Sequence, residues 1–223
     1  AFGIPLQFES VYIEGISAIS TEDVAYAEEL GYRIKHLGMA RKTAQGIELR
    51  VHPTLIPERR LIANVNDVMN AVLVKGDAVG STLYYGQGAG AEPTASAVVA
   101  DVIDVVRTMT ADPQNRVPHL AFQPDSLSDL VPVAKEQFES AYYLRLEAQD
   151  QPGVMADVTR VLGDLQISIE AILQKEPVEG SSTVPVILLT RRVSEGLINQ
   201  GIEQIEALDS VSKVCRIRVE TLG

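Results

Sequence analysis

Apolar residues recur at regular spacings in the C-terminal third of the chain. Four segments there are rich in aliphatic or aromatic residues and alternate in part, as strands do: 142–149, 167–174, 183–190 and 211–219. Residues 153–164 and 194–208 place apolar residues three and four positions apart, as on one face of a helix. The order strand, helix, strand, strand, helix, strand predicts a ferredoxin-like βαββαβ unit, a four-stranded antiparallel sheet with both helices on one side.

The first 110 residues predict a different α+β region. A helix is expected over residues 20–30, because Ser20 can cap it, Asp23 lies three positions on as in a capping box, and Gly31 permits a left-handed end. A second helix is expected over residues 93–109. Strands are expected between them, at residues 32–41, 47–55, 61–65, 68–74 and 80–85. Since no βαβ series appears, we expect a mixed or antiparallel sheet with helices.

A turn-rich stretch separates these regions. Residues 111–140 contain four prolines among Asn, Asp and Ser, a composition typical of an irregular connector. The predicted organisation is therefore a domain over residues 1–110, a connector over 111–140 and a second domain over 141–223.

The charge and the cysteine content restrict the classes of binding partner and the compartment that suit this chain. Thirty acidic and 19 basic residues give a net charge of −11, which disfavours nucleic acid and anionic membrane surfaces as partners. No apolar run approaches the roughly 20 residues of a membrane span. The single cysteine, Cys215, excludes an intrachain disulfide and suits a cytoplasmic protein. The chain starts at Ala1 without a basic leader, so we expect no signal peptide and a fragment or processed product.

Two glycine-containing loops are candidate ligand sites. Gly86, Gly88 and Gly90 form a GxGxG pattern between a predicted strand and helix, where backbone N–H groups can approach a ligand. The pattern is not the dinucleotide fingerprint GxGxxG, and a tight turn explains it equally well. The second loop, residues 150–153, joins a strand to a helix: Asp150 can cap the helix, and Gly153 allows close approach to its N–H groups. Taken alone, an ordinary turn is the more economical explanation there.

The sequence gives little support for a metal site or for a hydrolytic catalytic motif. His36, His52 and His119 have no metal-like spacing with one another or with Cys215, so no metal is expected. No Gly-x-Ser-x-Gly, HExxH or Cys/His pattern occurs.

Several segments together resemble the homoserine dehydrogenase family. The resemblance lies in residues 2–3 and 11–16, in 49–56, in 63–66 with 70–72, and in 86–90 with 93–97. The C-terminal region resembles an ACT domain, through Asp150-x-Pro152-Gly153-Val154-Met155-Ala156 and the Ile167-Ser168-Ile169 that follows. The resemblance spans essentially the whole chain and keeps the family's order.

This resemblance implies the C-terminal part of an enzyme that interconverts L-homoserine and L-aspartate 4-semialdehyde with NADP or NAD. The family's dinucleotide-binding domain and catalytic lysine would lie upstream of Ala1, so no catalytic residue is expected here. Cofactor contacts are implied for Gly90 first, then for Gly88 and Ala89. The ACT-like part implies a regulatory site for an amino acid, threonine by resemblance, at Asp150, Gly153, Val154 and Met155. Ile167, Ser168 and Ile169 would complete that site, from the same subunit or a second one.

The resemblance also implies a homo-oligomer, dimer or tetramer. The alternative interpretation is a stand-alone amino-acid-sensing module, in which the first region serves only as a dimerisation platform. A third, a soluble α+β protein without a ligand, fits the composition but leaves the paired motifs unexplained.

Overall fold

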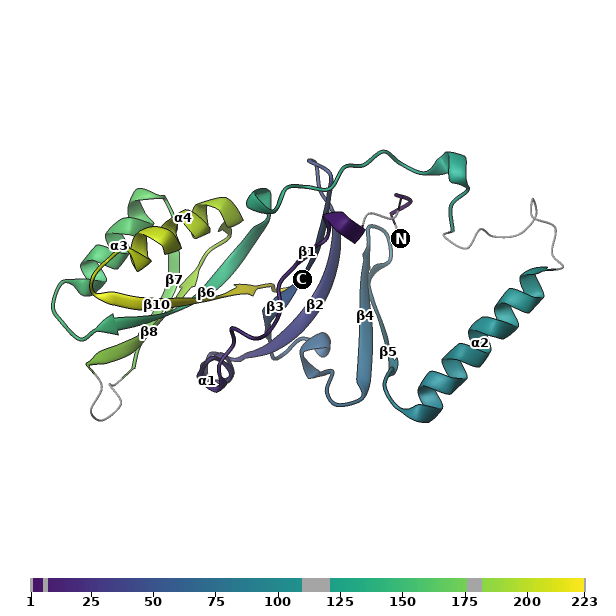
Figure 1. The fold of residues 1–223 in the computed structure, drawn as a ribbon, viewed down its shortest axis with the longest axis horizontal. Coiled ribbons are helices and arrows are strands. Elements are labelled where there is room, and N and C mark those ends of the chain that lie inside the picture. Colours follow the sequence, from purple (N-terminus) through teal and green to yellow (C-terminus); the bar gives the residue numbers. More distant parts are fainter. Residues whose placement is uncertain (1, 6–7, 110–120, 176–181, 223) are drawn as a thin grey trace. The chain divides into compact units, whose positions relative to one another are not determined.

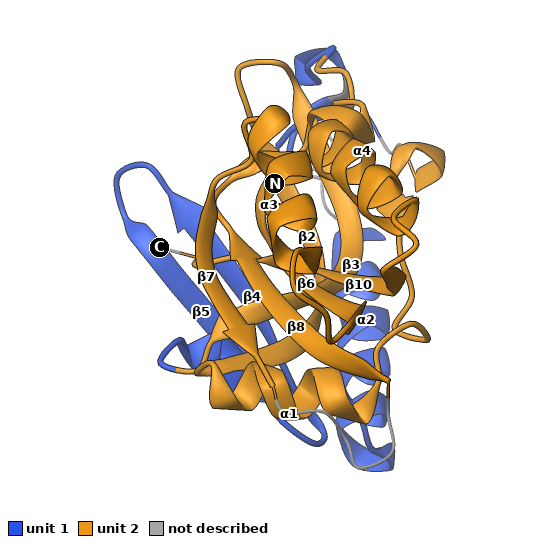
Figure 2. Ribbon diagram, turned by 90° about the vertical axis from the view of Figure 1, so that its left-hand side faces the viewer, with its two compact units in different colours: residues 1–6, 59–129 blue, residues 7–58, 130–223 orange. Residues whose placement is uncertain are grey.

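The computed structural model describes residues 2–5, 8–109, 121–175 and 182–222 (Figure 1). The chain divides into two compact units (Figure 2). The smaller unit comprises residues 1–6 and 59–129, and the larger comprises residues 7–58 and 130–223. Among the described helices, none is both long and apolar enough to cross a membrane.

The C-terminal part of the larger unit confirms the predicted βαββαβ order. Its strands are β6 (Glu139–Gln149), β7 (Ile169–Gln174), β8 (Thr183–Thr190) and β10 (Val211–Val219). They pair antiparallel in the order β10-β6-β8-β7. Helices α3 (Val154–Asp164) and α4 (Glu195–Glu206) lie on one side of this sheet (Figure 1). A two-residue strand, β9 (Val193–Ser194), pairs with the start of β6.

Both faces of this sheet are covered. Aliphatic residues at the predicted positions of α3 and α4, including Val158, Leu162, Ile198 and Ile205, pack on one face. The opposite face packs against Ala27 of helix α1 (Thr21–Glu29) and Leu55 of strand β3 (Ile47–Pro57). The predicted capping box of α1 is present, since Asp23 N donates to Ser20 Oγ and Ser20 N donates to Asp23 Oδ2.

Strand β3 connects the N-terminal region to the C-terminal sheet. It pairs antiparallel with β2 (Tyr32–Lys42) and parallel with β1 (Tyr12–Ile13). It also pairs parallel with β10, through Thr54 opposite Arg218 and Leu55 opposite Val219. For this reason the compact units cut across the boundaries expected at residues 110 and 140. Residues 7–58 of the expected first domain belong with the C-terminal sheet.

The side of β3 that faces away from Leu55 carries buried polar residues. Arg50 donates to Glu220 Oε1 (2.7 Å) and to Ser140 Oγ (3.0 Å), and all three side chains are buried. On β10, Arg218 contacts Glu195 and lies 2.8 Å from Glu14 Oε2. Buried ion pairs of this kind stabilise a fold only while both partners stay charged and hydrogen-bonded.

His52 belongs to this polar layer and should make stability depend on pH. Its side chain is fully buried, and burial together with the positive charge of Arg218 lowers the pKa of His52 to about 4. In the unfolded chain a histidine takes up a proton near pH 6.5, whereas the folded chain stays neutral at this position down to about pH 4. The free energy of unfolding contributed by His52 is therefore greatest above pH 6.5, and about 2 kcal/mol should be lost by pH 5.

Urea unfolding at pH 7 and pH 5 measures this loss, with His52→Gln as the comparison because glutamine does not titrate. We expect a smaller difference between the two pH values in the variant. The ion-paired carboxylates Asp23, Glu14 and Glu195 have lowered pKa values, so they titrate below this window. An equal loss of unfolding free energy in wild type and variant would show that His52 does not cause this pH dependence.

The smaller unit contains a hairpin and a long helix. Strands β4 (Met69–Gly76) and β5 (Gly80–Gln87) pair antiparallel, and helix α2 (Ala91–Met109) follows. The strand predicted over residues 61–65 is wrong, because Leu61–Asn64 form a 3-10 helix. Local bonds explain the difference: the Ala63 N–H and the Asn64 side-chain amide both donate to the Arg60 carbonyl. No residue of α2 is buried, and its apolar side chains, including Val98, Val102 and Met109, are exposed.

The predicted connector is divided between the units. Residues 121–129 belong to the smaller unit, and residues 130–140 belong to the larger one, where β6 already begins at Glu139. Residues 111–120 lie outside the described part of the chain. Two backbone hydrogen bonds join residues 130–140 to β3: the Ile47 N–H donates to the Val131 carbonyl, and the Ile47 carbonyl accepts from the Val133 N–H.

Candidate functional site

The loop between β6 and α3 places a glycine at the start of the helix. Gly153 is the N-cap residue of α3, with φ +99°, a backbone conformation that side-chain-bearing residues rarely adopt. No side chain caps this helix. The predicted capping role of Asp150 is therefore wrong, since Gly153 occupies the cap position. The first-turn N–H groups of α3 are left without a side-chain acceptor, an arrangement suited to an anionic ligand.

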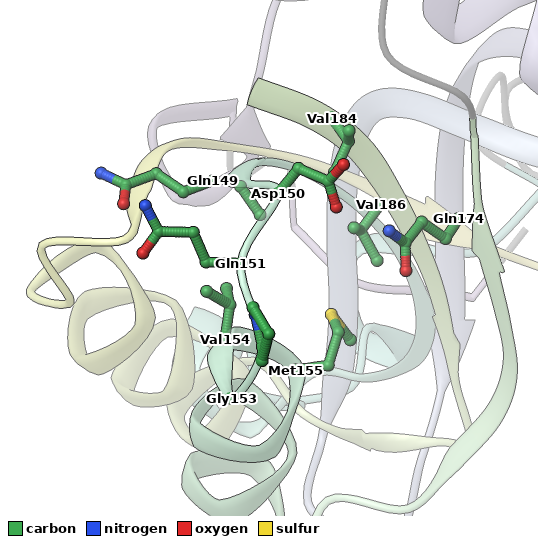
Figure 3. A pocket seen from close by; sticks show the side chains of 11 residues that line it. Gln149, Asp150, Gln151, Gly153, Val154, Met155, Gln174, Val184 and Val186 are labelled. Carbon is green, nitrogen blue, oxygen red and sulfur yellow. The ribbon is translucent and has the colours of Figure 1, made fainter. Parts of the chain in front are cut away.

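A hollow of about 200 Å³ lies beside this loop (Figure 3). Residues of the loop and the helix start form one wall, and the ends of β6, β7 and β8 form the other. The lining residues are Ala148, Gln149, Asp150, Gln151, Pro152, Gly153, Val154, Met155, Gln174, Val184 and Val186. In Figure 3 the Asp150 carboxylate, the Gln174 amide and the Met155 thioether surround the same opening.

Four of the seven expected effector-site residues line this hollow: Asp150, Gly153, Val154 and Met155. The other three, Ile167, Ser168 and Ile169, do not line it. Ile167 is 4% exposed and packs in the core beneath the helices, and Ile169 packs against the same core. Ser168 is exposed on the surface, and its carbonyl accepts from Arg191 N–H. Within one subunit these residues therefore form no part of the hollow.

Three lining residues were not identified from the sequence: Gln174, Val184 and Val186. Gln174 lies opposite Val186 in the β7–β8 ladder, and Val184 and Val186 share one face of β8 by the period-two alternation of a strand. That face carries the apolar residues packed under α3. The alternation of β8 is visible in the sequence, but the position of its end beside residues 150–155 depends on long-range pairing.

The hollow offers groups of opposite character. Asp150 is exposed and presents a carboxylate, an acceptor for an ammonium or hydroxyl group. The uncapped N-terminus of α3 presents backbone donors with a partial positive charge, which favour a carboxylate. Val154, Val184 and Val186 add apolar surface. This combination matches a small zwitterion with a short side chain.

The glycine loop of the smaller unit has a partly structural explanation. The N–H groups of Gly88 and Ala89 both donate to the Val68 carbonyl (3.1 and 3.4 Å), so they are already engaged. A Cβ at Gly88 would lie 2.2 Å from Asn70 Nδ2, which alone favours glycine there. Gly90 differs: its φ is +118°, and its carbonyl accepts from Thr94 N–H in the first turn of α2. Of the three predicted cofactor contacts, the backbone of Gly90 best fits an approach by a ligand.

Neither a metal site nor a reactive thiol emerges from the described residues. They contain no group of three or more His, Cys, Asp or Glu side chains arranged to hold a metal ion. Cys215 is buried, and its sulfur lies 3.5 Å from Asp23 Oδ2. Burial, together with the Asp23 charge, raises the pKa of Cys215 to about 11, so the thiol is protonated and weakly nucleophilic near neutral pH.

Two protein-family models match separate parts of the chain. A family model for homoserine dehydrogenase matches residues 1–103, and a model for the ACT domain matches residues 142–210. A homoserine dehydrogenase from Pseudomonas aeruginosa is 65% identical over 224 residues, which cover 100% of this chain and 52% of that protein. The chain belongs to the homoserine dehydrogenase family. Its homoserine dehydrogenase domain contains the Gly86–Gly90 loop, and its ACT domain contains the hollow at Gly153.

Further relatives show the same coverage. A homoserine dehydrogenase from Neisseria gonorrhoeae is 53% identical over 223 residues, covering 100% of this chain and 51% of that protein. The crystal structure of a homoserine dehydrogenase from Thiobacillus denitrificans matches with a TM-score of 0.90 and 64% identity, over 100% of this chain and 50% of that one. The chain thus spans about half the length of the relatives it matches.

Proposed function

We propose that this chain is the regulatory and partial substrate-domain portion of a homoserine dehydrogenase inhibited by threonine. The enzyme would interconvert L-homoserine and L-aspartate 4-semialdehyde in the biosynthesis of threonine, methionine and isoleucine, in the cytoplasm. The observation that carries the regulatory part is the hollow at Gly153, which combines uncapped helix donors, the Asp150 carboxylate and apolar walls. Threonine has a carboxylate, an ammonium group, a hydroxyl and one methyl group to match them.

The chemistry itself would reside mainly outside these residues. The proposed catalytic lysine and dinucleotide-binding domain would lie in the half of the relatives that this chain does not span. The nicotinamide cofactor, NADP or NAD, would supply the hydride when bound. The part of this chain that fits it is the Gly90 backbone at the start of α2, where Glu92 keeps a phosphate from being the favoured contact.

Two measurements test the proposal. Calorimetry of the chain against threonine, homoserine, valine and methionine should give heat of binding for threonine. The chain alone should show no NAD(P)-linked oxidation of homoserine. Absence of heat with every amino acid would refute the regulatory site, and turnover by the chain alone would refute the placement of the catalytic groups.

A stand-alone amino-acid sensor is the second candidate, because the ACT match and every lining residue of the hollow lie within one region of the chain, residues 142–210. In that case the first region would act as a dimerisation platform. The reading frame upstream of Ala1 discriminates the two: a βαβ segment with GxGxxG supports the enzyme, and its absence supports the sensor. Under either interpretation we propose a dimer or tetramer, which sedimentation measures.

Replacing Gly90 by valine should weaken cofactor use in the complete enzyme. Valine at φ +118° is strained by about 1–3 kcal/mol, and its side chain would occupy the space of the approaching ligand. We expect the KM for the nicotinamide cofactor to rise by about tenfold or more, since about 1.4 kcal/mol corresponds to a factor of ten.

Gly86→Val is the matched control, four residues earlier at the end of β5. A Cβ at Gly86 meets nothing within 4 Å, and its φ lies outside the left-handed region. Its KM for the cofactor should stay within about twofold of wild type, as for most surface substitutions. An unchanged KM in a folded Gly90→Val enzyme would show that this loop is only a turn.

A further inference from the structure

The glycine loop of the smaller unit, residues 86–90, is held by a single backbone carbonyl. The N–H groups of Gly88 (3.1 Å) and Ala89 (3.4 Å) both donate to the Val68 carbonyl. The side-chain amide of Asn70 donates to the same oxygen (3.3 Å). Three donors therefore meet at one acceptor, and this acceptor ties the loop to the residues just before β4.

A tight turn before β4 sets the direction of the Val68 carbonyl. Met69 N–H donates to the Asn66 carbonyl (3.1 Å), so residues 66–69 form a β-turn. Asp67, at the first central position of this turn, has φ +54°, in the left-handed region that aspartate enters more often than most residues. The acceptor that holds the glycine loop is therefore a backbone group in a defined turn.

Asn70 also contacts the loop through its side-chain volume. It lies directly opposite Gly86 in the β4–β5 ladder, and its side chain extends diagonally to Gly88. A Cβ at Gly88 would lie 2.2 Å from Asn70 Nδ2, 2.7 Å from Cγ and 3.2 Å from Cβ, so the amide fills the space beside this glycine. Asn70 is exposed, so this local contact positions its side chain, and core packing does not.

The loop continues from this contact into helix α2. Gly90 has φ +118°, and its carbonyl accepts from Thr94 N–H (3.1 Å) in the first turn of the helix. Only Ala89 separates Gly90 from Gly88. Because consecutive Cα atoms are held about 3.8 Å apart, a displacement of Gly88 is carried to the backbone of Gly90.

We propose that Asn70 is a positioning residue for the nicotinamide cofactor, acting through Gly88 on the backbone of Gly90. This inference rests on the proposed cofactor contact at Gly90. Asn70 bonds the carbonyl that the loop uses and fills the space beside Gly88, so it keeps Gly90 in the place where the cofactor approaches. Its role is in binding the cofactor and not in binding homoserine.

The complete enzyme carrying Asn70→Ala tests this role. Alanine keeps the Cβ and removes the amide, so the Val68 carbonyl loses one donor and Gly88 loses its neighbour. Fluorescence titration with NADPH and with NADH measures the Kd. For the cofactor that the wild type binds more tightly, the Kd should rise about three- to tenfold, the range for one lost hydrogen bond. The KM for homoserine should stay within about twofold.

Gly88→Ala reaches the same contact from the other side. Its methyl group would overlap the Asn70 amide, and because that side chain is exposed, it can rotate away and leave the loop without its support. Gly88→Ala should therefore raise the Kd about as much as Asn70→Ala. The double variant should be no worse than either single variant, since both remove one contact and only the Asn70 Cβ, at 3.2 Å, remains near the new methyl group.

Thr82→Val is the matched control in the same hairpin. The Thr82 hydroxyl donates to the Val74 carbonyl (3.4 Å), in the half of the hairpin away from the glycine loop. Its Kd for the cofactor should stay within about twofold of wild type. Hydrogen exchange of the cofactor-free enzyme, followed by mass spectrometry, gives a second readout: exchange at Gly88 and Ala89 should be faster in Asn70→Ala and unchanged in the control.

An unchanged Kd in folded Asn70→Ala, or unchanged exchange in the loop, would overturn the proposal. Single-variant effects that multiply in the double variant would also overturn it, because Asn70 would then not act through Gly88. Failure of the proposed cofactor contact is distinguishable, since it would leave the Kd unchanged in Gly90→Val too. Failure of this inference alone would leave the effect of Gly90→Val intact.

Discussion

Asp23→Ala is expected to lower the free energy of unfolding of the larger unit by about 3–5 kcal/mol, the range for removing one partner of a buried ion pair. Asp23 is fully buried and accepts from Arg145 Nε (2.6 Å), Arg145 Nη2 (3.1 Å) and the Tyr143 hydroxyl (3.1 Å). It also completes the capping box with Ser20. Its removal leaves the Arg145 guanidinium, whose side chain is 5% exposed, without its main counter-charge.

The ionisation of Asp23 gives a second signature. Burial alone would raise the pKa of this carboxyl, but hydrogen bonds from Arg145 and Ser20 outweigh it and lower the pKa below its usual value. Because the folded-state pKa is lowered, the stabilisation is present above the unfolded-state pKa and lost as the pH falls through the folded-state pKa. The variant should therefore lose less stability than wild type when the pH is lowered from 5 to 3.

Urea unfolding followed by circular dichroism measures both effects. Glu22→Ala is the control, because Glu22 lies next to Asp23 in the first turn of α1. Its side chain is 67% exposed, and its carboxylate comes no closer than 3.8 Å to the Arg145 guanidinium. The control should change by less than about 1 kcal/mol. Asp23→Asn keeps the shape without the charge and serves if the alanine variant does not fold. A change below about 1 kcal/mol in both Asp23 variants would show that the buried pair contributes little.

Gly153→Asp should abolish threonine inhibition of the complete enzyme while sparing its kcat. The new side chain is strained at φ +99° and ψ −25°, and its carboxylate would take the helix donors that we assign to the effector's carboxylate. Together, strain and repulsion should raise the threonine concentration for half-inhibition by about 100-fold or more, equivalent to about 3 kcal/mol.

The control makes the same substitution in the same helix. Gly163 lies near the other end of α3, is exposed, and has nothing within 4 Å of an added Cβ. Gly163→Asp should retain threonine inhibition. Inhibition retained in Gly153→Asp would show that this loop does not bind the effector, and a parallel fall in kcat would point to misfolding instead.

Local signals in the sequence predicted the elements well. The capping box at Ser20 and Asp23, the glycine at the start of α3 and the apolar stripes of α3 and α4 depend on neighbours within a few residues, so spacing alone reveals them. The strand predicted at residues 61–65 failed for a local reason too, since turn bonds to the Arg60 carbonyl outweigh the apolar residues there.

Long-range pairing accounts for the remaining differences. Spacing along the sequence did not reveal that Thr54 and Leu55 of β3 lie beside Arg218 and Val219 of β10. The first hollow shows the same limit. Its loop was found from the sequence, whereas Gln174, Val184 and Val186 come from strands whose positions depend on pairing. The family resemblance did not supply these positions either. It implied Ile167 as an effector-site residue, but within one subunit Ile167 lies in the core.

The position of β10 in the sheet has a consequence for biosynthesis. This strand leaves the ribosome after all the other described strands, yet it lies between β6 and β3 and contributes to both faces of the sheet. Until it emerges, the β2–β3 hairpin and the strands of the ACT domain expose the edges and apolar faces that β10 will cover. The larger unit is therefore completed only after Val211–Val219 have left the ribosome, and until then its nascent strands are vulnerable to aggregation and are substrates for chaperones.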